Sequence, residues 1–197
     1  VHGSPLNDEQ LVSIKKKFGF NPDEFFKVPK EVYEYYAQVS KRTAQKVEEW
    51  NQKYVEYQNK YPEDFKLLQS LIEGNFKYED FDKFMPKLNE SNKATRALSG
   101  MAINIVAQHV PGLIGGSADL SASNDTVLKG EKLFQPNQRD CRYIEFGIRE
   151  HAMQAIANGI RYYGFTGLVP FTATFLVFYQ YLLPAIRVAA LEHLRVL

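Results

Sequence analysis

The stretch RYIEFGIREHAM, residues 142–153, contains the two patterns from which folds of alternating strands and helices are built. Residues 142–146 form a short run with aromatic and β-branched side chains, which predicts a buried strand. The glycine at position 147 ends that run, and residues 150–163 follow with apolar side chains three and four positions apart, the period of a helix. The stretch therefore predicts a strand that leads directly into a helix.

The same alternation extends on both sides of this stretch. The further elements expected in this part of the chain are a helix that begins at Asn92 or Thr95, strands over residues 113–116 and 167–171, and a long apolar helix from Phe175 to Leu194 with a kink at Pro184. Helices that alternate with short buried strands indicate an α/β fold, with a mostly parallel sheet covered by helices on both faces.

The first part of the chain has a different composition. Residues 8–90 are rich in charged, amide and tyrosine side chains and predict a polar helical linker segment. The expected helices begin at Asn7 or Asp8, at Pro29, at Thr43 and beyond Pro62. Their aromatic residues are expected to pack, and their Lys and Glu side chains to form a solvated face. We therefore expect two regions, residues 1–90 and 91–197.

Composition excludes several classes of protein. The 197 residues carry 24 Lys and Arg against 23 Asp and Glu, so the net charge of +1 gives no indication of nucleic-acid binding. One cysteine, Cys141, rules out an internal disulfide or a multi-cysteine metal site. No apolar run approaches the roughly 20 residues of a membrane span, so no membrane partner is expected. Because Val1 is not an initiator methionine and Arg195–Leu197 opens a strand, we expect a piece of a longer chain.

Ligands of parallel sheets bind beyond the carboxyl ends of the strands, where three stretches of this chain are expected: 115–124, 147–151 and 171–181. Each has a structural and a functional interpretation. The segment GGSADL, 115–120, is a plain turn or a ligand loop, and Glu150 is a solvated charge or a functional acid at a helix start. The aromatic residues at 175, 178 and 181 form a core stripe or a pocket wall. Arg96 pairs with an acid or binds an anion.

Taken together, GGSADL at 115–120, RYIEFGIREHAM at 142–153 and TFLVF at 174–178 closely resemble transketolases, as do HGSPL at 2–6 and KFGFNPD at 17–23. The resemblance implies an incomplete thiamine diphosphate-binding fold. Residues 1–90 would be the end of the pyrophosphate-binding domain and a linker. Residues 91–197 would be the N-terminal half of the pyrimidine-binding domain.

The resemblance also implies a function. The full enzyme would move a two-carbon ketol unit from a ketose phosphate to an aldose phosphate through a thiamine diphosphate ylid, in the pentose phosphate pathway. It would be a cytoplasmic homodimer with the active site between subunits. The cofactor would need magnesium or calcium, held by a Gly-Asp-Gly motif that this chain lacks, so the isolated 197 residues are expected to be inactive.

Individual roles carry over by position. Glu150 matches the catalytic glutamate that hydrogen-bonds the pyrimidine ring of the cofactor. The other matches are an aromatic wall around the pyrimidine, formed by Phe175, Phe178 and Tyr181; cofactor contacts by Asp119 and His2; and sugar-phosphate contacts by Arg96, Ser123 and His2. No metal ligand is expected in the chain.

Two alternatives stay open. Dihydroxyacetone synthase, a peroxisomal relative that uses formaldehyde as acceptor, shares the segments YIE at 143–145 and AIANG at 155–159. The other alternative is a non-catalytic pyrimidine-domain protein that acts through dimer contacts. Two departures from the family pattern bear on specificity and packing: the loop over 125–141 is shortened, and Phe171-Thr172-Ala173 replaces a glycine-rich stretch.

Overall fold

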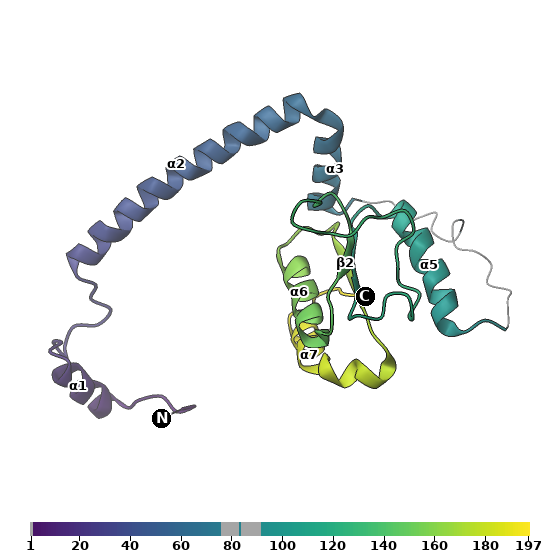
Figure 1. Ribbon diagram of the computed structural model, residues 1–197. Coiled ribbons are helices and arrows are strands. Elements are labelled where there is room, and N and C mark those ends of the chain that lie inside the picture. Colours follow the sequence, from purple (N-terminus) through teal and green to yellow (C-terminus); the bar gives the residue numbers. More distant parts are fainter. Residues whose placement is uncertain (1, 76–82, 84–91) are drawn as a thin grey trace. The chain divides into compact units, whose positions relative to one another are not determined.

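The computed structural model describes residues 2–75, 83 and 92–197. By contacts the chain divides into two compact units, Val1–Lys60 and Tyr61–Leu197 (Figure 1). The first unit contains two helices, α1 (Asp8–Lys17) and α2 (Lys30–Lys60). No helix in the described ranges is long and apolar enough to cross a membrane.

The start of α1 follows the sequence prediction. The Asn7 side chain accepts a hydrogen bond from the Gln10 N–H, and the Gln10 side chain accepts one from the Asn7 N–H, which forms a capping box. The prediction of separate helices from Pro29 and Thr43 is wrong, because α2 runs unbroken over both. No glycine or proline interrupts residues 30–60, and Ser40, Lys41 and Arg42 continue the helix.

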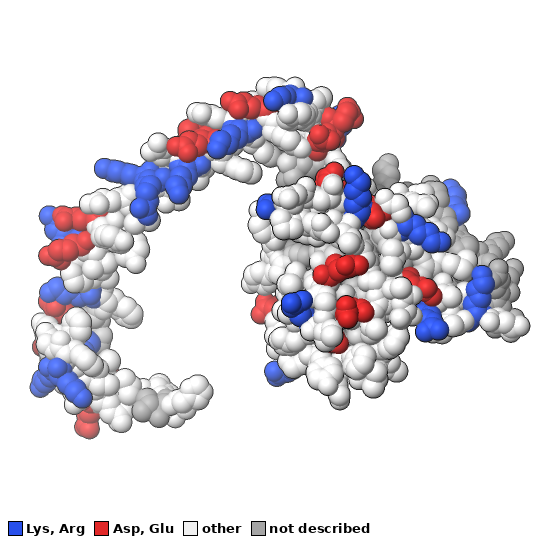
Figure 2. Space-filling model, in the orientation of Figure 1, with Lys and Arg blue, Asp and Glu red and all other residues white. Residues whose placement is uncertain are grey.

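None of the side chains of α2 is buried, and the packing expected of its aromatic residues stays a prediction. Tyr35 and Tyr36 contact each other edge to face, and Trp50 is 65% exposed. Lys and Arg alternate with Glu along the helix (Figure 2), which fits the expectation of a solvated face.

The second unit is built around a three-stranded parallel sheet of order β2-β1-β3. Its elements among the described residues are α3 (Pro62–Glu73), α5 (Thr95–His109), β1 (Leu113–Ser117), β2 (Tyr143–Glu145), α6 (Glu150–Tyr162), β3 (Val169–Ala173), the 3-10 helix η1 (Leu176–Tyr181) and α7 (Leu183–Leu191). The expected alternation of helices with short parallel strands is confirmed.

Helices cover both faces of the sheet, as predicted. On one face a buried cluster joins Ala107 of α5 to Leu113, Tyr143 and Phe171. On the other face Met153 of α6 packs with Ala118, Phe146 and Leu182, and Ile144 joins this cluster. Tyr143 and Ile144 are consecutive residues of β2 in different clusters, because side chains of a strand point alternately to its two faces.

The predicted single helix over residues 175–194 is wrong. The chain forms η1 first and then α7, with Pro184 in the first turn of α7. Proline is accepted there because the first-turn N–H groups have no partner within a helix, whereas the interior of a longer helix would lose a hydrogen bond. The 3-10 period of three residues per turn also suits the aromatic residues spaced three apart.

Helix α3 is joined to the rest of the second unit by hydrogen bonds to its backbone carbonyls. The Gly167 N–H donates to Leu71 O at 2.8 Å, and the Thr166 hydroxyl donates to Ile72 O at 3.0 Å. Gly74, at φ 68°, ends the helix in a left-handed turn against Thr166. These contacts place the last helix before residue 76 with the sheet-bearing unit.

We expect Gly116→Ala to destabilise the second unit by about 3 kcal/mol or more, because a Cβ at this position would lie 1.8 Å from Ile144 O in the neighbouring strand. The control is Gly159→Ala in α6, where a Cβ meets nothing within 4 Å. That change should stabilise by up to ~1 kcal/mol through helix propensity. Thermal and denaturant unfolding of both variants measures the contrast, and equal stabilities would show that the strands can separate to admit a side chain.

Candidate functional site

Three segments meet beyond the carboxyl ends of the parallel strands. Asp119 follows β1, Glu150 follows β2, and Phe175 follows β3. The strands run in the same direction in adjacent register, so their ends lie at one edge of the sheet. Asp119 has a left-handed backbone, φ 58°, which aspartate tolerates better than most residues and which turns the chain away from β1. The sheet therefore brings these three sequence-predicted segments to one place.

Glu150 is the first residue of α6 and is half-buried. Its carboxylate makes no hydrogen bond or ion pair with any residue in 2–75, 83 or 92–197. The start of a helix favours a negative charge, because the first N–H groups of the helix are unpaired. The carboxylate thus stands at a helix start with no partner among the described residues.

The two arginines of the surrounding motif have structural contacts. Arg149 donates from Nη1 to Phe146 O at 2.8 Å, across the turn at Gly147. Arg142 forms a partly buried ion pair with Glu131. It also donates to the last carbonyls of α5 and the loop after it, those of Ala107, Val110 and Pro111. These contacts close α5 and fix the turn before α6.

The aromatic residues predicted to line the pyrimidine pocket form a continuous stack, which we call the aromatic turn (Phe175, Phe178 and Tyr181). The rings of Phe175 and Phe178 are nearly parallel, 7° apart with centroids at 6.5 Å. Those of Phe178 and Tyr181 are tilted by 34° with centroids at 6.4 Å. Helix α6 packs against η1, so the helix that begins with Glu150 also contacts the element that carries these rings.

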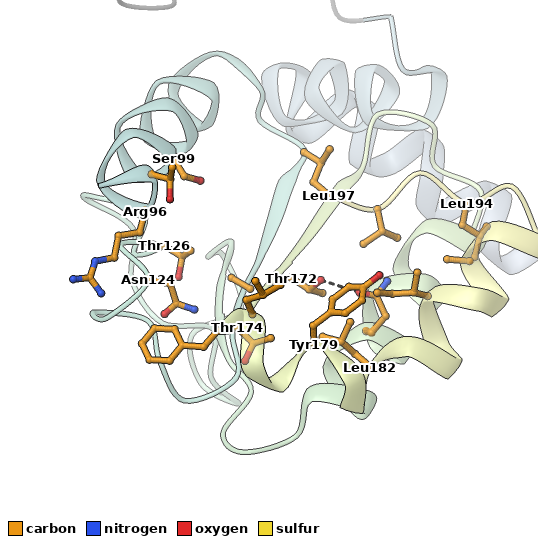
Figure 3. A pocket seen from close by; sticks show the side chains of 18 of the residues that line it. Arg96, Ser99, Asn124, Thr126, Thr172, Thr174, Tyr179, Leu182, Leu194 and Leu197 are labelled. Carbon is orange, nitrogen blue, oxygen red and sulfur yellow. Dashed lines mark hydrogen bonds between the residues drawn. The ribbon is translucent and has the colours of Figure 1, made fainter. Parts of the chain in front are cut away.

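A pocket of about 830 Å³ opens beside this region (Figure 3). Arg96 and Phe175, both predicted site residues, line it, whereas Glu150, Asp119 and Ser123 do not. Its apolar wall is formed by residues of η1, α7 and the end of the chain, including Leu182, Ile186, Ala189, Leu194 and Leu197.

Three polar side chains that the sequence analysis missed also line this pocket. Asn124 Oδ1, Thr126 Oγ1 and Thr174 Oγ1 are buried and have no hydrogen-bond partner among the described residues. Buried polar atoms are usually satisfied, so these atoms mark a polar corner suited to a ligand or to another part of the protein. Arg96 stands at the same corner and donates to Ser123 O at 3.4 Å. The structure therefore brings together the two residues predicted to hold a sugar phosphate.

Asn104 of α5 fixes the loop that carries this polar corner. Its amide nitrogen donates to Val127 O at 3.1 Å, and its amide oxygen accepts from the Lys129 N–H at 2.7 Å. Gly100 lets the loop approach the helix, since a Cβ there would lie 2.5 Å from Asp125 O. Asn104 is an amide on a largely apolar helix face, and that exception to the helical pattern was the available sequence signal.

The rest of the loop before β2 is also held by hydrogen bonds. The Phe134 N–H donates to Tyr143 O at 2.8 Å. In the same loop, hydrogen bonds from its own backbone and from the Gln138 side chain lower the pKa of Asp140 below its ordinary value. Asp140 does not line the pocket, so this shift concerns the loop and not the site.

The other predicted contacts are less closely defined. His2 belongs to the first unit, and its assignment to the cofactor and substrate stays a prediction. Within residues 2–75, 83 and 92–197, no group of three or more His, Cys, Asp or Glu side chains could hold a metal ion.

Comparison with known families matches both parts of the chain. Residues 91–197 match the transketolase pyrimidine-binding domain. Residues 1–77 match the transketolase thiamine diphosphate-binding domain. The chain belongs to the transketolase family. Its sheet, with helices on both faces, is therefore part of a thiamine diphosphate-binding fold, as the sequence predicted.

Individual relatives agree with this assignment. The chain is 40% identical over 204 residues to a probable transketolase of Schizosaccharomyces pombe, and 36% identical over 206 residues to a dihydroxyacetone synthase of Candida boidinii. These matches cover 100% and 99% of the chain but only 29% of each relative. A Pichia stipitis transketolase solved in complex with sedoheptulose-7-phosphate superposes with a TM-score of 0.81 at 38% identity, over 98% of this transketolase chain and 29% of that one.

We expect Asn104→Ala to release the loop that carries the polar corner. The change removes the acceptor of the Lys129 N–H and the donor to Val127 O, each net hydrogen bond contributing about 1 kcal/mol. Hydrogen exchange followed by NMR should show faster exchange at the Lys129 amide, while amides in β1 keep their protection. Unchanged protection at Lys129 would mean that the loop is held by other contacts.

Proposed function

We propose that the protein to which this chain belongs is a thiamine diphosphate-dependent transketolase. It transfers a two-carbon ketol unit from a ketose phosphate to an aldose phosphate, as in the pentose phosphate pathway, in the cytoplasm. The observation that carries the proposal is a half-buried glutamate, Glu150, at the start of a helix that packs against the aromatic turn, in a chain of the transketolase family.

The residues of this chain fit the pyrimidine half of the cofactor. The nearly parallel rings of Phe175 and Phe178 offer flat apolar faces, against which a heteroaromatic ring can stack. The carboxylate of Glu150, with no protein partner among the described residues, can share a hydrogen bond with a ring nitrogen. When bound, thiamine diphosphate supplies the carbon centre that takes up and passes on the two-carbon unit.

Glu150 would act on protons and not on carbon. It would hold a proton between its carboxylate and the pyrimidine ring nitrogen. The aromatic turn would exclude water from this hydrogen bond, which strengthens it in a medium of low dielectric constant. Asp119, on its left-handed backbone beyond β1, would border the same space.

Arg96 and Ser123 would bind the phosphate of the sugar. The guanidinium group suits a phosphate because its N–H groups form a planar fork. The Pichia stipitis transketolase carries a sugar phosphate in its crystal structure, which supports this class of substrate. Magnesium or calcium, bound by residues outside this chain, and a homodimer with the site between subunits complete the proposal.

Dihydroxyacetone synthase is the second candidate, favoured by the 36% identity to the Candida boidinii enzyme. The two functions differ only in the acceptor, an aldose phosphate or formaldehyde. An assay of the intact protein with a ketose phosphate donor and each acceptor separates them. Preference for formaldehyde would favour the synthase, together with a peroxisomal location.

In the intact protein we expect Glu150→Gln to lower turnover by about 100- to 10,000-fold, because glutamine cannot exchange the proton that a positioned carboxyl transfers. Cofactor affinity, measured by calorimetric titration, should change far less. The control is His151→Gln at the adjacent, exposed position, which should keep nearly full activity. Turnover of the Glu150 variant within threefold of wild type, with cofactor bound, contradicts the proposed function.

We expect Arg96→Ala to raise the Michaelis constant for sugar phosphates about ten- to a hundredfold, since a charge-assisted hydrogen bond contributes roughly 1.5–3 kcal/mol. Hydroxypyruvate, a donor without a phosphate, should be affected little. Arg96→Lys keeps the charge but loses the planar fork of N–H groups, so its Michaelis constant for sugar phosphates should lie between those of the wild type and Arg96→Ala. Equal losses for both donors would assign Arg96 a structural role, through its bond to the backbone of Ser123.

A further inference from the structure

A chain of three hydrogen bonds crosses the interior of the second unit from β3 through α6 to α7. The Thr172 hydroxyl donates to Gln154 Oε1 at 2.8 Å (the dashed line beside Thr172 in Figure 3). Gln154 Nε2 donates to Asn158 Oδ1 at 3.0 Å, and Asn158 Nδ2 donates to Ala185 O at 2.8 Å. Gln154 is 4% and Asn158 7% exposed. We call these four residues the polar relay.

The direction of every bond in the polar relay is fixed by its last member. A backbone carbonyl only accepts, so the amide nitrogen of Asn158 must face Ala185 and its oxygen must face Gln154. Gln154 must then present its nitrogen to Asn158, which leaves its oxygen for the hydroxyl of Thr172. Turning either amide over would set oxygen against oxygen in a buried place. The relay therefore has one fully satisfied arrangement.

The same face of α6 carries the proposed catalytic group. Glu150, Gln154 and Asn158 are four residues apart, so they lie in one row along the helix. Because two members of this row are bonded to β3 and α7, the rotation of α6 about its own axis is fixed. Glu150 begins the helix one turn before Gln154, and its direction follows from that rotation.

The two ends of the polar relay flank the aromatic turn in the sequence. Thr172 lies on β3, three residues before Phe175, and Ala185 lies in α7, after Tyr181. The relay thus connects the helix of Glu150 to the element before the aromatic turn and to the element after it. We propose that Thr172, Gln154 and Asn158 are positioning residues that set Glu150 against the aromatic turn, an inference that rests on the proposed function.

Packing alone does not account for polar residues at these positions. Apolar side chains of similar volume would fill the space without the cost of burying two amides, and the neighbouring Met153 and Ala157 are apolar and buried. Directional hydrogen bonds, in contrast, distinguish one rotation of the helix from another, which apolar contacts do only weakly. A small displacement of a catalytic group of about 1 Å can reduce rates about a hundredfold, so such precision has a functional reason.

The test uses the intact protein loaded with thiamine diphosphate and magnesium. Gln154→Met keeps the length of the side chain and removes two bonds of the polar relay; Thr172→Val removes only the first donor, and Thr172→Ser retains it. The control is Arg161→Met at the other end of α6, which loses hydrogen bonds to Phe165 O, Thr166 O and Leu168 O. Four quantities are measured: the thermal midpoint, kcat, KM, and the exchange rate of the thiazolium C2 proton by quenched-flow NMR.

We expect Gln154→Met to slow C2 proton exchange and kcat by about ten- to a hundredfold with KM within threefold. Thr172→Val should have an intermediate effect and Thr172→Ser almost none. Arg161→Met should lower the thermal midpoint without slowing the exchange. In the cofactor-free protein, the Asn158 side-chain amide protons should exchange slowly, and faster in Gln154→Met.

Two outcomes would overturn the proposal. If Gln154→Met lowers the thermal midpoint as Arg161→Met does and leaves C2 exchange within twofold of wild type, the polar relay only stabilises the fold. Unprotected Asn158 amide protons would show that the relay does not form. Glu150→Gln distinguishes failure of the positioning proposal from failure of the proposed function. If C2 proton exchange is slow in Glu150→Gln but normal in Gln154→Met, only the positioning role of the polar relay is refuted. If C2 proton exchange is normal in both variants, the proposed function is refuted as well.

Discussion

The backbone of β1 lies so close to its neighbours that two of its positions have room only for glycine. A Cβ on Gly115 would lie 1.9 Å from Phe171 O of β3, and one on Gly116 would lie 1.8 Å from Ile144 O of β2. The three strands are paired in parallel, so their carboxyl ends lie at the same edge of the sheet. The segments that follow them, with Asp119, Glu150 and Phe175, consequently come together at one edge of the sheet.

Helix α6 connects this edge to the rest of the unit. Its N-terminus presents Glu150, its buried face packs Met153 and Ala157 into the core, and its polar relay reaches β3 and α7. Its far end is joined by Arg161 to carbonyls of the loop that also bonds α3, a contact that concerns stability. A helix whose rotation is set by the polar relay suits a residue whose proposed task, sharing a proton with a ring nitrogen, depends on distance and direction.

The charged residues of the stretch 142–153, which indicated the family, have different roles that the sequence does not show. Arg142 and Arg149 are cations of this motif that are engaged by protein groups: Glu131 and backbone carbonyls before β1 for Arg142, and Phe146 O for Arg149. Glu150 has no such partner among the described residues, and unlike the exposed Glu145 it is half-buried. The stretch Phe171-Thr172-Ala173 supplies the first donor of the polar relay.

Sequence alone determined the parallel α/β architecture, the family and the candidate residues, because strands, helix starts and motifs depend on local spacing. It did not determine the break between η1 and α7, which depends on how neighbouring residues share hydrogen bonds, whereas the continuity of α2 follows from the lack of glycine and proline in residues 30–60. The hydrogen bond of Arg96 to Ser123 joins residues 27 positions apart, and that of Asn104 to Lys129 joins residues 25 apart. In the polar relay, Thr172 and Gln154 are 18 positions apart. Only tertiary structure decides such contacts, because an amide in a sequence does not show which distant donor or acceptor it will meet.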